Sequence, residues 1–210
     1  MSKGVLTVVS GFSGAGKGTV MKRLIQKYDD YALSISVTTR KPREGERDGI
    51  EYFFKTKEEV EAMIENDEFL EYARYVDNYY GTPRFYVEEM LAKGKNVILE
   101  IEIQGAMQIK AKNPEAVLIF VTPPSFEELR NRLVGRGTET ADVIESRLRR
   151  ASEEAEGMSS YDYILVNDQV EDCVDRLHQI ILSERAKAQR NEEFINTIRQ
   201  EARIFMKGDK

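Results

Sequence analysis

Short apolar segments alternate with longer charged segments along most of the chain. Five of the apolar segments have the length and composition of buried strands, namely residues 5–10, 33–39, 97–101, 116–122 and 163–166. Apolar residues recur at i, i+3 and i+4 in segments 17–28 and 126–134, which is the periodicity of a helix. Buried strands that alternate with helices predict an α/β fold, with a parallel five-stranded sheet flanked by helices.

Segment 40–80 breaks this alternation. It holds an aromatic triplet at 52–54, a helical segment at 56–66 and a strand-like segment at 69–76. We therefore expect a small α+β insert within the α/β core. The glycine-rich segment 135–140, between two predicted helices, is expected to be a mobile lid.

The chain becomes polar beyond residue 183, and Phe194, Ile195, Ile198 and Phe205 recur at roughly helical spacing. This pattern predicts a C-terminal helix that lies either on the body of the protein or on a partner chain. The expected divisions are core 1–36, insert 37–89, core 90–134, lid region 135–150, core 151–183 and helical tail 184–210.

Composition narrows the function classes. The chain has 210 residues, 41% hydrophobic and 32% charged, which fits one globular domain with inserts. Its 31 Lys and Arg against 37 Asp and Glu give a net charge of −6, which argues against a nucleic-acid partner. With Cys173 as the single cysteine and His178 as the single histidine, an internal disulfide and a structural zinc site are both excluded. The N-terminal apolar stretch is too short for a signal peptide or a membrane span, so we expect a cytoplasmic protein with no membrane partner.

A phosphate-binding loop stands between the first strand and the first helix. The spacing Gly11-x-x-x-x-Gly16-Lys17 lets backbone N–H groups converge on phosphate oxygens, and the helix N-terminus adds partial positive charge. Lys17 supplies a cation that can follow charge on a transferred phosphoryl group. The context predicts a nucleoside triphosphate site rather than a simple turn. The residues expected to contact ATP in this loop are Gly11, Ser13, Gly14, Ala15, Gly16, Lys17, Gly18 and Thr19.

Position 18 departs from the usual loop, which has Ser or Thr after the lysine. The nearest hydroxyl is that of Thr19, so either Thr19 contacts Mg²⁺ or the nucleotide and water hold the metal. The Gly-Lys-Gly-Thr form is also similar to the loop of adenylate kinases. The loop alone therefore does not select a phosphate acceptor.

Two arginines, Arg40 and Arg43, follow the strand-like segment that ends at residue 39. Pro42 excludes a helix at this point. Planar guanidiniums that lie close together suit the bidentate hydrogen bonds of a phosphate monoester, and the phenols of Tyr52 and Tyr80 can complete its shell. The segment predicts a second phosphate site, distinct from the loop.

Glu71 indicates which base accompanies this second phosphate. A carboxylate accepts from two adjacent N–H donors, which guanine offers at N1 and N2 and adenine does not. The hydroxyls of Ser36 and Thr82 can donate to the guanine O6. These three side chains predict a guanine site.

Taken together, the motifs resemble those of the guanylate kinase family. They span residues 5–182, and the segments that carry the resemblance are 11–19, 36–46, 69–73, 78–82, 100–105, 122–125, 132–140 and 166–168. The resemblance implies a P-loop kinase fold and transfer of the γ-phosphoryl group of ATP to GMP, and to dGMP, giving ADP and GDP. It further implies Mg²⁺ as cofactor and a monomer or homodimer.

The resemblance also assigns roles to individual residues. It makes Ser36, Glu71 and Thr82 the guanine readers, and Glu46 the acid that steadies a phosphate clamp. The clamp that it implies consists of Arg40, Arg43, Tyr52 and Tyr80. The implied catalytic residues are Lys17, Arg43 and three lid arginines that close on the triphosphate, Arg132, Arg136 and Arg147.

Three further positions follow from the resemblance. Asn167 matches the adenine side of the ATP pocket. Glu100 and Glu102 match acids that hold a guanine amine or a water of Mg²⁺. Members of the family often have Asp at the second or at both of these positions, so the longer Glu is a departure.

Two rival functions stay open at this point. Guanylate-kinase-like domains that only bind protein partners typically lose the loop lysine or the lid arginines, whereas all four of those residues are present here. A kinase for another nucleoside monophosphate, such as AMP, is disfavoured by Glu71 together with Ser36 and Thr82. An ADP-release assay with GMP tests the first rival, and a screen of acceptors tests the second.

Overall fold

The computed structural model describes residues 3–75, 77–135, 137 and 140–207. Within these residues, five strands form a parallel sheet in the order β2-β7-β1-β8-β9. Their bounds are β1 Leu6–Gly11, β2 Tyr31–Leu33, β7 Asn96–Glu100, β8 Val117–Thr122 and β9 Tyr163–Val166. The three central strands β7, β1 and β8 are almost wholly buried, as the unbroken apolar runs predict.

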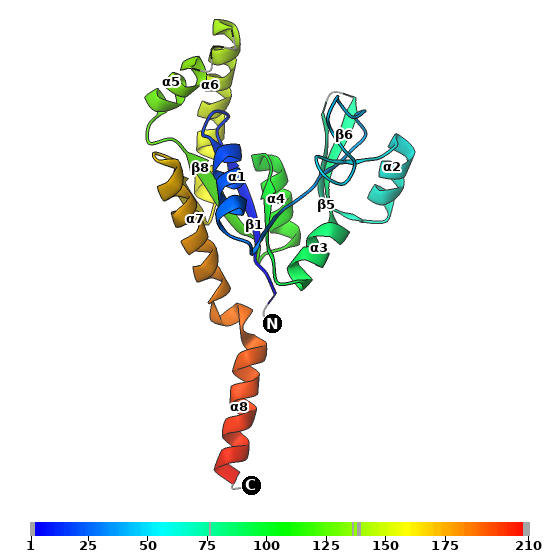
Figure 1. Ribbon diagram of the computed structural model, residues 1–210, viewed down its shortest axis with the longest axis vertical. Coiled ribbons are helices and arrows are strands. Elements are labelled where there is room, and N and C mark those ends of the chain that lie inside the picture. Colours follow the sequence, from blue (N-terminus) through cyan, green and yellow to red (C-terminus); the bar gives the residue numbers. More distant parts are fainter. Residues whose placement is uncertain (1–2, 76, 136, 138–139, 208–210) are drawn as a thin grey trace.

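Helices cover both faces of this sheet (Figure 1). The connections β1–α1–β2 and β7–α4–β8 run in opposite directions along the sheet, so right-handed crossovers place α1 and α4 on opposite faces. Helix α7 packs beside α1. The bounds are α1 Lys17–Lys27, α3 Arg84–Ala92, α4 Ile103–Lys112, α5 Phe126–Gly135, α6 Ala141–Glu156, η1 Met158–Ser160 and α7 Val170–Arg185. The predicted α/β architecture is confirmed.

A second, smaller sheet stands beside the core, with strand order β4-β3-β6-β5. It consists of β3 Val37–Thr38, β4 Phe53–Phe54, β5 Phe69–Tyr75 and β6 Asn78–Pro83, and α2 Lys57–Glu65 lies against it. Val37, Val60 and Phe69 form its own apolar cluster. Helix α4 contacts β5 and so links this α+β insert to the core.

One strand prediction is wrong. Segment 33–39 was expected to be a single strand of the parallel sheet, whereas the chain leaves that sheet after Leu33 and enters the insert sheet at Val37. β2 pairs with β7, and β3 pairs with β4 and β6. Leu33, Ile35 and Val37 alternate with polar residues across both strands and their connection, so the pattern does not show where the chain changes sheets.

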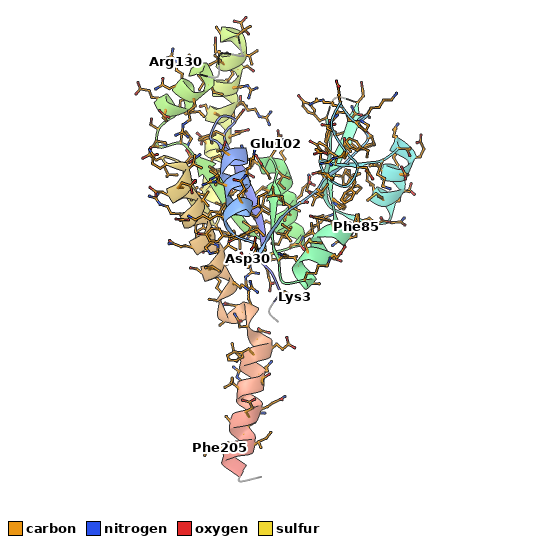
Figure 2. All side chains as sticks on the ribbon, viewed as in Figure 1. Lys3, Asp30, Phe85, Glu102, Arg130 and Phe205 are labelled. Atoms are coloured by element: carbon orange, nitrogen blue, oxygen red, sulfur yellow. The ribbon has the colours of Figure 1, made fainter. Side chains whose placement is uncertain are left out.

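The last helix of the C-terminal tail does not pack on the body. After η2 Ala188–Arg190, helix α8 Glu192–Lys207 extends away from the core, with Phe205 near its far end (Figures 1 and 2). Phe194 and Phe205 are 64% and 85% exposed. The prediction that this helix lies on the body of the protein is therefore wrong. The domain boundaries proposed from the sequence stay a prediction, and α6 runs without a break through residue 150. Among the described helices, none combines the length and apolarity that a membrane crossing requires.

Candidate active site

The phosphate-binding loop contains glycines in conformations that other residues rarely adopt. Gly11 has φ 147°, and a Cβ on it would lie 2.1 Å from the carbonyl oxygen of Val121 in the neighbouring strand. Gly16 adopts the left-handed conformation at φ 88°, where a Cβ would lie 2.6 Å from Nδ2 of Asn167. Among the described residues no side chain caps the N-terminus of α1. Its first N–H groups therefore suit an anion.

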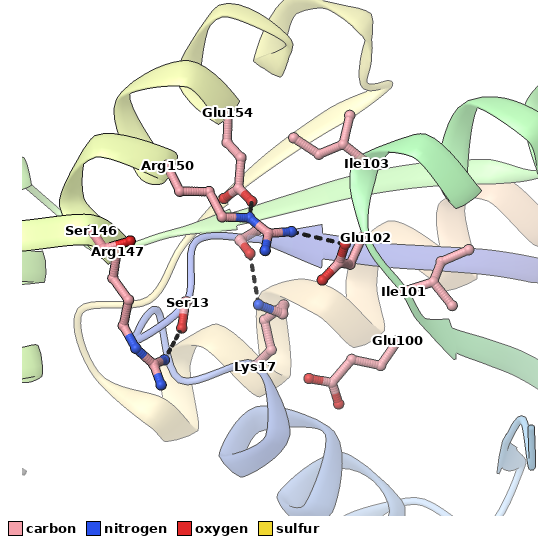
Figure 3. Close-up of a pocket in the computed structure, with 11 residues that line it drawn as sticks. Ser13, Lys17, Glu100, Ile101, Glu102, Ile103, Ser146, Arg147, Arg150 and Glu154 are labelled. Carbon is pink, nitrogen blue, oxygen red and sulfur yellow. Dashed lines mark hydrogen bonds and ion pairs between the residues drawn. The ribbon is translucent and has the colours of Figure 1, made fainter. Parts of the chain in front are cut away.

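Lys17 lies on the first turn of α1 with its ammonium turned back to the loop. Nζ donates to the carbonyl oxygens of Gly11 at 2.7 Å and Phe12 at 3.2 Å. The side chain lines a cleft of about 480 Å³ that also contains Arg147 and Glu102 (Figure 3). The cation expected from the sequence thus faces a pocket, and the protein's own carbonyls hold it there.

Two arginines of α6 reach the same cleft from the opposite wall. Nη1 of Arg147 donates to Oγ of Ser13 in the loop at 2.5 Å. One turn later, Arg150 pairs with Glu102 at 2.8 Å and with Glu154 at 2.9 Å (Figure 3). Arg150 was missed by sequence reasoning, although its position three residues after Arg147 places both on one face of the helix.

The other arginines expected in the lid are placed less centrally. Arg132, on α5, donates through Nε to Glu128 at 2.8 Å, an ion pair within its own helix. Arg136 lies outside the described residues. The structure thus brings Arg147 to the cleft, and leaves Arg132 bound to a carboxylate of its own helix.

Asn167 lies beneath the loop. The side chain is 2% exposed, and its Nδ2 donates to the carbonyl oxygen of Ala15 at 2.7 Å. Among the described residues, its buried Oδ1 has no hydrogen-bond partner. In this arrangement Asn167 fixes the backbone of the loop.

The side chains expected to read guanine are held in place by contacts within the protein. Glu71, on β5, is 8% exposed, and its Oε1 accepts from the hydroxyl of Thr82 on β6 at 2.6 Å. Burial raises the pKa of Glu71 above its ordinary value, while the hydrogen bonds from Thr82 oppose that shift. Gly105 on α4 has a supporting role that sequence reasoning missed, because a Cβ there would lie 3.2 Å from Oε2 of Glu71. The sequence indicated this position only through the place of Gly105 in segment 100–105, which carries part of the family resemblance.

The hydroxyl proton of Thr82 is used on Glu71, so this hydroxyl offers only lone pairs to a ligand. Ser36 lies in the connection between β2 and β3 and lines a pocket of about 110 Å³ together with Thr82. Glu100 and Ile101, at the carboxyl end of β7, line both this pocket and the larger cleft. The two pockets therefore meet at the end of β7.

Glu100 and Glu102 differ in their surroundings. Desolvation in the cleft raises the pKa of Glu100, although the nearby ammonium of Lys17 opposes the shift. Glu102 is the N-cap residue of α4, and its carboxylate is engaged by Arg150. Glu100 is thus the acid that lies between the two pockets, and Glu102 belongs to the wall that faces α6.

The expected phosphate clamp is partly assembled. Nη2 of Arg40 lies 2.8 Å from Oε1 of Glu46, and its guanidinium lies 5.3 Å from the centre of the Tyr52 ring. The hydrogen bond to Glu46, with a further one to Tyr80, raises the pKa of Arg40. Tyr52 and Tyr80 pack edge to face, with their ring centres 6.2 Å apart. Arg40, Glu46 and the two tyrosines therefore form one cluster.

Arg43 lies at the edge of this cluster. Its backbone N–H donates to Oε2 of Glu46 at 2.7 Å, while its side chain is exposed. Glu46 thus holds Arg40 through one oxygen and the backbone of Arg43 through the other, and the Arg40 hydrogen bond lowers the pKa of Glu46 first of all. That Glu46 steadies a phosphate clamp stays a prediction.

The residues around the loop fit a Mg²⁺ that arrives with a nucleotide. Thr19 is exposed on the first turn of α1, so its hydroxyl is accessible. A Cβ on Gly18 would meet nothing within 4 Å, so space does not explain the glycine. Among the described residues no cluster of three acids, histidines or cysteines could hold a metal alone. Mg²⁺ ordinarily keeps several waters and binds through substrate phosphates, for which one hydroxyl and one nearby carboxylate suffice.

Comparison with known proteins agrees with this geometry. The family model for guanylate kinase matches residues 3–184. The chain is 57% identical over 189 residues to the guanylate kinase of Bacillus anthracis, covering 90% of this chain and 92% of the relative. It is 50% identical over 200 residues to that of Caldanaerobacter subterraneus, covering 95% and 97%. The crystal structure of guanylate kinase from Anaplasma phagocytophilum matches 90% of each chain with a TM-score of 0.69 and 36% identity.

The phosphate loop borders the larger cleft, and Ser36 and Thr82 line the smaller pocket. The family model covers these residues as well as Glu71 and the cluster around Arg40. The chain belongs to the guanylate kinase family, whose members are ATP:GMP phosphotransferases.

Proposed function

We propose that this chain transfers the γ-phosphoryl group of ATP to GMP from two adjoining sites, with ATP in the larger cleft and GMP in the insert. The observation that carries the proposal is that Glu100 and Ile101 line both pockets. A donor phosphate at Lys17 and an acceptor nucleotide beside Ser36 and Thr82 then approach each other at the end of β7. Transfer needs such an in-line approach of the two phosphates.

On the donor side, the loop N–H groups and the N-terminus of α1 bind the phosphates of ATP. Lys17 leaves the carbonyl oxygens of Gly11 and Phe12 and follows the γ-phosphoryl group. Arg147 leaves Ser13 and neutralises charge in the transition state, together with Arg132 and Arg136. Phosphoryl transfer depends on positioning and charge neutralisation, so no covalent enzyme intermediate is needed. Asn167 supports the loop.

Mg²⁺ is proposed as the cofactor that accompanies ATP. Bound to the phosphate oxygens, it supplies positive charge that neutralises the transferred group. Thr19 is the residue of the loop that would hold it, and Glu100 would accept a hydrogen bond from one of its waters.

On the acceptor side, Arg40 and Arg43 bind the phosphate of GMP, and Tyr52 and Tyr80 donate their hydroxyls to it. Glu71 accepts from N1–H and N2–H₂ of guanine, and Ser36 donates to O6. Thr82 keeps the Glu71 carboxylate in position. AMP would present an unprotonated N1 to this carboxylate, and a site built around such hydrogen bonds rejects the wrong partner by about four orders of magnitude.

The experiment is an ADP-release assay with ATP and one acceptor at a time. We expect turnover with GMP and dGMP, much weaker turnover with IMP because it lacks the 2-amino group, and negligible turnover with AMP, CMP and UMP. Turnover with AMP comparable to that with GMP would refute the proposed acceptor site. ADP release that is the same with and without GMP would refute transfer to GMP.

A further inference from the structure

Two threonines at the end of β3 hold the start of the segment that carries Arg40 and Arg43. Thr38 is the last residue of β3 and is fully buried, and Thr39 follows it. Oγ1 of Thr38 accepts from the backbone N–H of Arg40 at 3.2 Å and donates to the carbonyl oxygen of Tyr79, on β6, at 3.0 Å. One buried hydroxyl therefore ties the backbone of Arg40 to the neighbouring strand.

Thr39 makes the matching contacts with the same residue of β6. Its Oγ1 accepts from the backbone N–H of Tyr79 at 2.9 Å and donates to Oδ1 of Asn78 at 3.3 Å. Its own backbone N–H donates to the carbonyl oxygen of Tyr79 at 3.2 Å. Both backbone polar groups of Tyr79 are thus bound to the threonine pair. Because β3 ends at Thr38, these bonds hold the chain beyond the regular part of the sheet.

The bonds connect two sides of the cluster around Arg40. Arg40 directly follows the threonine pair in the sequence. Tyr80 directly follows Tyr79 and lies opposite Thr38 in the strand register. The guanidinium of Arg40 is hydrogen-bonded to Tyr80, so a shift of either backbone segment changes the distance between these two side chains. The hydroxyls of Thr38 and Thr39 limit that shift.

Burial in a strand does not by itself explain these hydroxyls. Thr7, on β1, is equally buried, yet among the described residues its Oγ1 has no hydrogen-bond partner. Valine has nearly the same shape as threonine, so packing alone does not need the oxygen. At Thr38 the oxygen is donor and acceptor at once, and both of its partners are backbone groups at or next to a residue of the cluster.

We propose that Thr38 and Thr39 are positioning residues. Their hydroxyls set the spacing of Arg40 and Tyr80, and thereby the affinity for the phosphate of the acceptor nucleotide. The inference rests on the proposed function, in which Arg40 and Tyr80 bind the phosphate of GMP. It concerns phosphate binding and not the choice of base, because the hydrogen bond of Glu71 lies elsewhere, between β5 and β6.

The first test is steady-state kinetics of three variants. Thr38→Val removes the hydroxyl with little change in shape, and Thr38→Ser keeps the hydroxyl. Thr7→Val makes the same exchange at a buried threonine whose hydroxyl has no partner within the described part of the chain. Thr38→Val should raise the KM for GMP about tenfold, with kcat, the KM for ATP and the preference for GMP over AMP unchanged. Thr38→Ser and Thr7→Val should behave as wild type.

Three kinetic results would overturn the proposal. One is an unchanged KM for GMP in Thr38→Val. Another is an equal rise in the KM values for GMP and ATP, which would mean a general disturbance of the fold. The third is a Thr38→Ser enzyme as impaired as Thr38→Val, because the hydroxyl would then not be the group that matters.

A double variant tests whether Thr38 acts through Arg40. In an Arg40→Ala background, Thr38→Val should add no further increase in the KM for GMP, because the side chain that it positions is already absent. Additive effects of the two changes would contradict the proposal.

The second test is amide hydrogen exchange of the protein without nucleotide, followed by NMR, which does not depend on the reaction. The N–H groups of Arg40 and Tyr79 donate to the two hydroxyls. Thr38→Val should speed exchange at Arg40, and Thr39→Val should speed exchange at Tyr79, each by about tenfold. Thr7→Val should change neither. Unchanged exchange in both threonine variants would overturn the positioning role, whatever the acceptor is. A wild type that does not phosphorylate GMP would instead refute the proposed function.

Discussion

The donor and acceptor sides of the site differ in how far they are assembled without ligand. On the donor side, Lys17 is bound to loop carbonyls and Arg147 to Ser13, so each must exchange a protein oxygen for a phosphate oxygen. On the acceptor side, Glu71 is already buried and already held by Thr82. The side chains proposed to recognise the base are thus preorganised, whereas the cations proposed to act on the transferred phosphate are not.

This difference has a physical reason. A buried carboxylate must be fixed by hydrogen bonds, because an unpaired buried charge is costly. Cations that neutralise a transition state, in contrast, must move when water is expelled and the nucleotides are enclosed. The comparison predicts that selectivity resides in the acceptor side, which is already held in place, and that rate depends on rearrangement of the donor side.

Glu71→Gln should have the largest effect. The amide presents N–H donors where guanine also donates, so the preference for GMP over AMP, expected at about four orders of magnitude, should be mostly lost. The ratio of kcat/KM for the two acceptors measures it. Glu68→Gln, an exposed acid three residues earlier, is the matched control and should keep the wild-type ratio. If Glu71→Gln keeps it too, Glu71 is not the reader.

Lys17→Met should reduce kcat by about two or more orders of magnitude, because it removes one charge contact that strengthens in the transition state. GMP binding, measured by calorimetry, should stay nearly unchanged. Lys22→Met on the exposed face of α1 is the control. A Lys17→Met enzyme with more than about a third of wild-type turnover would contradict this role.

Arg43→Ala should weaken GMP far more than ATP. Loss of a hydrogen bond to a charged group costs about 1.5–3 kcal/mol, or about 10- to 150-fold in the KM for GMP. Arg47→Ala, in the same exposed segment, should have little effect. Equal weakening of both nucleotides by Arg43→Ala would place Arg43 in the triphosphate site or assign it to the fold.

Arg150→Gln tests whether Arg150 holds α6 in place through its ion pair with Glu102 or contacts ATP directly. Because the pair is solvent-exposed, its loss is worth about 0–1 kcal/mol, or up to about fivefold. We expect this ion pair to hold α6 in its ligand-free arrangement, which must change when ATP binds. Loss of the pair should then lower the KM for ATP. A higher KM would mean that Arg150 contacts ATP. Arg149→Gln breaks a comparable exposed pair with Glu145 and should leave the KM unchanged.

The smallest expected effect is on the pH dependence of the free energy of unfolding, through Glu71. Because burial raises the pKa of Glu71 above 4.5, the folded state binds a proton more tightly than the unfolded state. Wild type should therefore lose stability relative to Glu71→Gln as the pH rises from about 4.5 through the raised pKa, and the difference should then level off. Urea unfolding at several pH values measures it. A difference that is the same at pH 4 and pH 8 would show that Glu71 is not strained by burial.

Much of this site could be predicted from the sequence, because short motifs fix local geometry. The glycines of the loop and Lys17 lie where the loop motif predicts them. The Thr82 hydroxyl was expected to donate to guanine O6 and instead donates to Glu71, because this buried carboxylate needs a donor. Whole strands of the core followed from apolar runs.

Other features depend on partners that a local pattern does not contain. Segment 33–39 reads as one strand because its alternation of apolar and polar residues continues across two strands of different sheets. Arg150 is one of many charged residues on α6, and its spacing from Arg147 alone does not predict the contact with Glu102. The apolar residues of α8 predict burial without specifying what buries them.

The central claim, that base recognition is built before the donor side rearranges, is tested most directly by calorimetry without ATP. GMP, IMP and AMP are titrated separately into the wild-type protein. The account predicts that GMP binds clearly, that IMP binds more weakly, and that AMP shows no binding at the same concentrations. Equal affinities for the three nucleotides, with selectivity only after a non-hydrolysable ATP analogue is added, would contradict it.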